Sequence, residues 1–102
     1  MQTINLKFTY QYVLKGNELS LIGDIEFARC PVRMFRMDVH FVDADGIILS
    51  STRPISIKSR RSRHLPVSFD RKVPPNTRSM AFSYRGEIGD RNADFSQFWR
   101  AP

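Results

Sequence analysis

The sequence is poor in the features that usually reveal a protein's chemistry, and each absence narrows the choice of function. It holds one cysteine, Cys30, so no disulfide can form within the chain, and a zinc site would need other ligands. Only two histidines, His40 and His64, are available for such a site. No glycine-rich phosphate loop and no GxSxG, HExxH or CxxC motif occurs. We therefore predict a protein that is not an enzyme and that has no metal or cofactor.

Long apolar runs are also missing. None approaches the roughly 20 residues that a bilayer-spanning helix needs. No signal peptide is visible, because Met1-Gln2-Thr3 leads directly into an alternating pattern. The chain is therefore compatible with a cytosolic protein and with the mature part of an exported protein whose leader was removed.

What is present is typical of one globular domain, which we place at residues 1–102. A hydrophobic content of 41% and a charged content of 25% fit a folded chain with a single core. The net charge is +6 and the pI is about 10.1, with twelve of the sixteen basic residues being arginine. Such a surface attracts polyanions, among them nucleic acid, anionic lipid, acidic glycans and acidic proteins.

Apolar and polar residues alternate along most of the chain, which is the period of a half-buried β-strand. The pattern predicts strands over 4–14, 19–27, 35–41, 47–51, 55–57, 65–69 and 80–84. Turn residues separate them at Lys15–Glu18, Asp45–Gly46 and Pro74–Thr77. No segment shows a sustained helical period. We predict an all-β fold, an antiparallel β-sandwich of about seven strands of the immunoglobulin or fibronectin type III kind.

Three positions interrupt or extend this pattern. Gly23 occupies an inward position, which predicts a bulge or a close approach of a neighbouring backbone. Pro54 marks either the end of its strand or an edge position. The tail carries Phe95, Phe98 and Trp99, and this aromatic surface predicts that the tail docks back onto the core, as a last strand. The same aromatics are alternatively a binding lip.

The stretch "FVDADGIIL", followed by "VSFDRKVPPNT" and "MAFSY", resembles the FxLYD-like group of small bacterial envelope domains. There, a strand with a terminal aromatic leads into an aspartate-glycine hairpin, and a proline-glycine turn precedes the penultimate strand. The likeness covers Phe35 to Tyr84, and it departs from the pattern at Phe41-Val42-Asp43 and at Asn76, which replaces the turn glycine. The resemblance implies a sandwich fold and favours an exported, extracytoplasmic setting over a cytoplasmic one. It brings no catalytic residues.

The densest basic run is "KSRRSRH", from Lys58 to His64. Its candidate anion-binding residues are Lys58, Arg60, Arg61, Arg63 and His64. The run lacks the interleaved aromatics of a protein that binds single-stranded nucleic acid. A solvated loop between two strands is the simpler interpretation.

Arg36, Asp38 and His40 project from one strand face. Asp38 could orient an imidazole, but no nucleophile is near in sequence, so we expect cross-strand ion pairing. "DADG" (43–46) resembles part of a calcium loop. Its glycine comes two residues early, however, and the twelfth position is Pro54, so a hairpin turn is expected instead.

Cys30 lies in a strand connection, with Arg29 and Arg33 near it in sequence. Neighbouring cations can activate a thiol, but a buried or merely free thiol is the simpler expectation.

These observations favour a non-enzymatic β-sandwich module of bacterial origin, a protein-interaction or structural domain. The alternative, from a different class, is a protein that binds nucleic acid or another polyanion through Lys58–His64. A third reading is an enzyme whose cleft the sequence does not reveal. A leader peptide upstream of Met1 in the gene would favour the first. Its absence, together with salt-sensitive retention on heparin, would favour the second.

Overall fold

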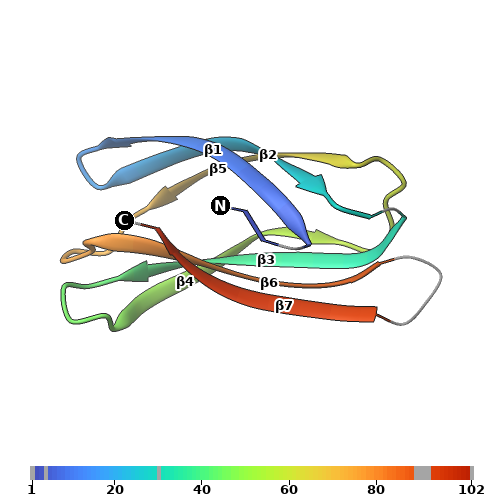
Figure 1. Cartoon of the computed structure of the whole chain (residues 1–102). Helices are drawn as coiled ribbons and strands as arrows, with labels where there is room; N and C mark the ends of the chain where they lie inside the picture. Colours follow the sequence, from blue (N-terminus) through green and yellow to red (C-terminus); the bar gives the residue numbers. More distant parts are fainter. Residues whose placement is uncertain (1, 4, 30, 89–92, 102) are drawn as a thin grey trace.

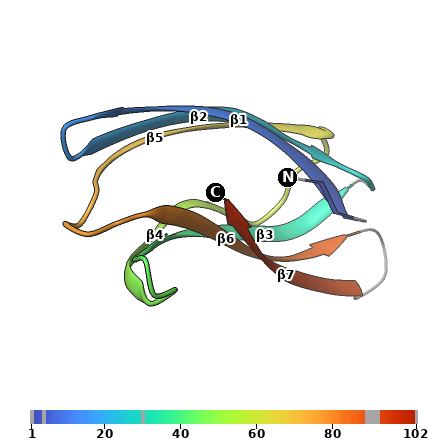
Figure 2. The same cartoon turned by 60° about the vertical axis from the view of Figure 1, so that its left-hand side comes forward.

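The chain folds into two facing antiparallel sheets (Figures 1 and 2), as the alternation predicted. The computed structural model describes residues 2–3, 5–29, 31–88 and 93–101, with Ile88 and 93–101 described for their backbone only. Within these residues the strands are β1 (Leu6–Lys15), β2 (Glu18–Phe27), β3 (Val32–Val42), β4 (Ile48–Ile57), β5 (His64–Lys72), β6 (Ser79–Ile88) and β7 (Ala93–Ala101). One sheet has the order β1-β2-β5 and the other the order β4-β3-β6-β7. No helix in the described part of the chain could span a membrane.

The core lies between the sheets and is built from every second residue of the strands. Its largest fully buried side chains are Phe8, Phe27, Phe35, Phe41, Phe82, Leu6, Leu21, Ile25, Met37, Val32 and Val39. Aromatic contacts join the two layers: Phe82 of β6 meets Phe8 of β1 with ring centroids 5.4 Å apart, and Phe35 of β3 meets Phe27 of β2 at 5.0 Å. Each buried ring contributes a few kcal/mol, on the order of 2–3, which lets one core hold the domain.

The segment around Pro54 differs from the prediction of two short strands. Residues 48–57 form the single strand β4, with a register irregularity opposite Met37–Val39 of β3. Pro54 is accommodated because β4 lies at the edge of its sheet, where a missing N–H donor breaks no ladder. The strand therefore continues through the proline, and the separate strand predicted at 55–57 is wrong.

Gly23 confirms the predicted close approach. A Cβ at this position would lie 2.5 Å from the Thr9 carbonyl oxygen and 2.9 Å from Cε1 of Phe8. The pairing of Gly23 with Tyr10 on one side and with Val67 on the other is continuous, so no bulge forms there. β1 therefore packs on β2 at a distance that only glycine permits.

The backbone of residues 93–101 runs antiparallel to β6 as β7. The structure describes only the backbone here, so the predicted role of the Phe95, Phe98 and Trp99 side chains lies outside the described part of the chain, as does Cys30.

The "DADG" segment forms the hairpin turn between β3 and β4. Oδ1 of Asp43 accepts the N–H groups of Asp45 and Ile47, each at 2.9 Å. Gly46 has φ of 83°, a conformation that side chains rarely adopt. The Asp43 carboxylate thus organises the turn itself, as the hairpin interpretation expected.

Gly46→Val should lower the free energy of unfolding by about 1–3 kcal/mol, because a β-branched residue is strained at positive φ. Chemical denaturation followed by far-ultraviolet circular dichroism measures this loss. A variant as stable as the parent would show that the turn does not hold Gly46 in this conformation.

Candidate functional site

Cationic and titratable side chains gather at one end of the sandwich, where the β2–β3 turn and the β4–β5 loop lie (right in Figure 1). We call this end the basic pole. It is defined by Arg29, Arg33, Lys58, Arg60, Arg61, Arg63 and His64. The fold thus brings together the candidate anion-binding run and two arginines that sequence reasoning had considered only as neighbours of Cys30.

Main-chain hydrogen bonds hold the β4–β5 loop against the neighbouring strands. The N–H of Arg60 donates to the carbonyl of Val32 at 2.8 Å, and the N–H of Val32 donates to the carbonyl of Arg60 at 2.7 Å. The N–H of Phe27 donates to the carbonyl of Arg63, also at 2.8 Å. The loop backbone is therefore tied to both β2 and β3, so its arginine side chains project from a fixed frame.

Two members of the candidate run also bind within the protein. Nε of Arg60 donates to the carbonyl oxygen of His64 at 2.9 Å. The same carbonyl accepts the hydroxyl of Ser62 at 3.1 Å. His64, the first residue of β5, places Nδ1 2.7 Å from Oδ2 of Asp24 on β2. Arg60 and His64 therefore help to order the loop in addition to their charge.

Four other cations of the pole are more accessible to a ligand. Arg29, Lys58, Arg61 and Arg63 are exposed, and none forms an ion pair with another residue that the structure describes. Exposed guanidinium groups bind carboxylates and phosphates through paired N–H donors. Along residues 28–29, 31–33 and 58–64, no aromatic side chain is present for a nucleic-acid base to stack on. The described part of the pole therefore presents exposed cations without a Phe, Tyr or Trp among them.

Sequence reasoning missed Arg29 and Arg33 as part of this surface. The number of strands between the two connections could have revealed that they lie at the same end. In an antiparallel sandwich of consecutive strands, every second connection lies at the same end, so the connection after the second predicted strand faces the one after the fourth. Because two strands were predicted within 47–57, the count was displaced by one and the juxtaposition was hidden.

His64 should titrate above its ordinary value. The hydrogen bond to Asp24 raises the pKa of His64, and the charges of Asp24 and Glu26 add to this effect. A raised folded-state pKa means that the stabilisation is fully present below the ordinary pKa of 6.5 and is lost as pH rises through the folded pKa. In nuclear magnetic resonance titrations, Asp24→Asn should lower the pKa of His64. Equal pKa values of His64 in parent and variant would contradict the hydrogen bond between His64 and Asp24.

A second polar cluster lies on the outer face of the four-stranded sheet. Nδ1 of His40 is 2.7 Å from Oγ of Ser51, and Nε2 is 2.7 Å from Oγ of Ser83. Nε of Arg53 donates to Oδ1 of Asp38 at 2.7 Å, which confirms cross-strand ion pairing on this face. This hydrogen bond lowers the pKa of Asp38.

The two serines are the hydroxyl partners that sequence reasoning did not find near His40. They come from β4 and β6, 11 and 43 residues away, so only the sheet order brings them together. A nucleophile needs a base that a third group orients. Here the nearby carboxylate, Asp38, is bound by Arg53. We therefore interpret the cluster as a cross-strand hydrogen-bond network. Among the described residues, no group of acidic, histidine or cysteine side chains could hold a metal ion.

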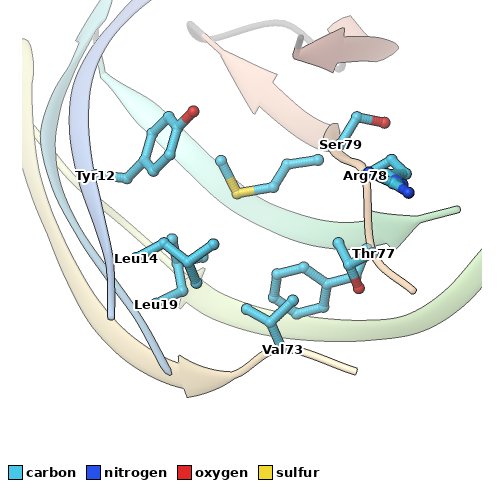
Figure 3. A pocket seen from close by; sticks show the side chains of 9 residues that line it. Tyr12, Leu14, Leu19, Val73, Thr77, Arg78 and Ser79 are labelled. Atoms are coloured by element: carbon cyan, nitrogen blue, oxygen red, sulfur yellow. The ribbon is translucent and has the colours of Figure 1, made fainter. Parts of the chain in front are cut away.

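A small apolar cleft opens at the end opposite the basic pole (Figure 3). Its volume is about 100 Å³, and Tyr12, Leu14 and Leu19 line one side while Val73 and Thr77 line another. Tyr12 and Leu14 have the inward parity that the alternation predicted, yet they are 48% and 54% exposed. Both side chains point toward the other sheet, but they line the open cleft and so remain exposed to solvent.

Comparison with known proteins found no matching family model, no matching curated protein and no matching solved structure.

Proposed function

We propose that this chain is a non-enzymatic binding module of the immunoglobulin or fibronectin type III kind. The strand order supports the type: β1, β2 and β5 face β3, β6 and β7, as strands A, B and E face C, F and G in such sandwiches. β4 pairs with β3 and so occupies the place of a C′ strand. The resemblance to bacterial envelope domains makes an exported setting part of this proposal.

The observation that carries the function is the basic pole. Arginines from two separate connections meet at one end of the domain, on backbones that hydrogen bonds hold in place. The Arg53–Asp38 ion pair lies on the outer face of the four-stranded sheet, and the His64–Asp24 contact helps to hold the loop of the pole. In sandwich modules, loops gathered at one end form the binding surface. We infer that the pole contacts an acidic surface of a protein partner.

A second candidate is a polyanion such as nucleic acid, and the arginine content of the pole favours it. The absence of stacking aromatics from the described part of the pole places it second. The two candidates differ in whether binding depends on nucleic acid.

Capture from a cell extract tests the proposal. We expect the immobilised domain to retain an acidic protein at moderate salt, before and after nuclease treatment. The triple variant Arg60→Ser, Arg61→Ser, Arg63→Ser should lose it. The matched control, Arg71→Ser, Lys72→Ser, Arg78→Ser, removes the same charge from the opposite end and should retain it. Retention that the pole variant does not weaken would contradict the role of the pole.

The same triple variant also separates folding from polyanion binding. Its stability should fall by only about 1 kcal/mol, the net worth of the lost hydrogen bond from Arg60 to the His64 carbonyl, because Arg61 and Arg63 are exposed and should contribute less than about 0.5 kcal/mol each. In titrations with labelled single- and double-stranded oligonucleotides, parent and variant should both bind weakly at moderate salt. Micromolar or tighter binding by the parent, lost only in the pole variant with a salt slope reduced by about one unit per lost contact, would promote the polyanion candidate.

A further inference from the structure

The open edge of β1 is built differently from the edges of β4 and β5. β4 is an edge strand with Pro54 and a register irregularity, and β5 is an edge strand with Pro66. Prolines and irregular pairing are two of the devices by which sheets prevent edge-to-edge association. β1 contains no proline and pairs with β2 in an unbroken register over its whole length. Its edge (Figure 2) therefore lacks these protections.

The hydrogen bonds at the start of β1 show which residues face its open edge. Leu6 donates its N–H to Oγ1 of Thr3 at 3.2 Å and accepts the N–H of Thr3 on its carbonyl at 2.9 Å. Both groups of Leu6 thus point away from β2. In an antiparallel strand this orientation repeats at every second residue, so Tyr12 and Leu14 also direct their N–H and C=O groups outward. An isolated antiparallel bridge joins Gln2 to Lys7, so the residues just before β1 fold back onto the first part of this edge.

The far half of the same edge is also apolar. Tyr12, Val13 and Leu14 are 48%, 56% and 54% exposed, and Ile22 of β2 is 59% exposed. Ile22 pairs with Gln11, so it shares the outer face of the sheet with Val13 and lies diagonal to it. Contiguous exposed apolar side chains mark interaction sites. Main-chain groups and apolar side chains therefore coincide on one segment, residues 12–14.

We propose that this edge pairs with the same edge of a second copy of the chain, antiparallel and centred on Val13. In this register Tyr12 lies opposite Leu14 of the partner, so that the outward main-chain groups of both are bonded. Lys15 lies opposite Gln11. A register centred on Gln11 would instead place Lys7 opposite Lys15, and like charges directly opposite are unfavourable.

The basic poles do not oppose this arrangement despite the net charge of +6. β1 begins near the basic pole and ends at the opposite pole, since Leu6 pairs with Phe27 and Lys15 pairs with Glu18. Contact near its end in antiparallel orientation directs the two basic poles away from each other. The domain is 43 Å long, and charges are screened over about 8 Å at physiological salt, so the poles do not repel each other appreciably. This inference does not depend on the proposed function.

Sedimentation velocity over a concentration series tests the proposal. The interface is short, so we expect a weak dimer with a dissociation constant on the order of 100 µM. Leu14→Pro removes an outward N–H while leaving the ladder to β2 intact, as edge positions tolerate. It should weaken dimerisation at least about tenfold. Val13→Lys should do the same by placing lysines opposite each other.

Ser68→Lys is the matched control, because it adds the same charge to β5, at the other edge of the same sheet. It should dimerise like the parent. Circular dichroism verifies that each variant folds. If Leu14→Pro does not fold, the effect of Val13→Lys on dimerisation decides the test. A parent that stays monomeric, a dimer that neither variant weakens, equal weakening by Ser68→Lys, or growth beyond the dimer would each overturn the proposal.

Discussion

Replacing Gly23 with valine is expected to lower the free energy of unfolding by about 3 kcal/mol, the upper end of the usual cost of overpacking. The added Cβ would lie 2.5 Å from the Thr9 carbonyl oxygen and 3.0 Å from Cβ of Tyr10. The Thr9 oxygen is a main-chain atom, so it cannot rotate away, and β1 would have to separate from β2. Urea denaturation followed by circular dichroism measures the loss.

Gly16→Asn is the control for this prediction. Gly16 has φ of 62° in the β1–β2 turn, and a Cβ there would meet nothing within 4 Å. Asparagine tolerates this conformation, so the change should stay within about 0.5 kcal/mol. Equal losses in the two variants would contradict the close approach of β1 as the reason for glycine at position 23.

Gly23 also shows what a period-two pattern can predict. Alternation assigns each residue to a face, and a residue without a side chain on an inward face leaves room that a neighbour must fill. The same logic correctly placed Phe8, Phe27, Phe35 and Phe82 in the core. Face and close approach are local properties, so a single sequence reveals them.

Edge position is not a local property, which explains why the sequence left two alternatives at Pro54, of which the edge position is confirmed. The same proline would end a central strand and is harmless in an edge strand. Whether β4 is an edge depends on the order β4-β3-β6-β7, which is set by pairings far apart in the sequence. Without this order, the alternation of Ile55 and Ile57 looked like a separate strand.

The alternating pattern also does not reveal whether the opposite sheet covers an inward-facing residue. Tyr12 and Leu14 have the parity of core residues, but more than two fifths of each is exposed. Similarly, Oγ1 of Thr3 lies 2.7 Å from the hydroxyl of Tyr84, 81 residues away. Both features arise from tertiary packing, which the local pattern does not encode.

The candidate site was predictable in part for the same reason. The run from Lys58 to His64 is dense in cations and visible in sequence, whereas Arg29 and Arg33 join it only through topology. The contact of Val32 with Arg60 shows how: the β2–β3 turn and the β4–β5 loop are bonded to each other at the end of the sandwich. The cationic run of the site can therefore be read from the local sequence, whereas the residues that join it depend on the fold.

Phe35→Ala is expected to lower the free energy of unfolding by about 3–5 kcal/mol, the cost of a cavity in place of a buried ring. Phe35 is fully buried, and its ring lies 5.0 Å from that of Phe27 and 6.0 Å from that of Tyr84, so it joins the two sheets. The N–H of Phe27 also binds the carbonyl of Arg63, which ties this part of the core to the basic pole. Chemical denaturation measures the loss, and Phe35→Leu, which refills most of the volume, should recover more than half of it. If the alanine and leucine variants were equally destabilised, the lost ring contacts rather than the cavity would account for the effect.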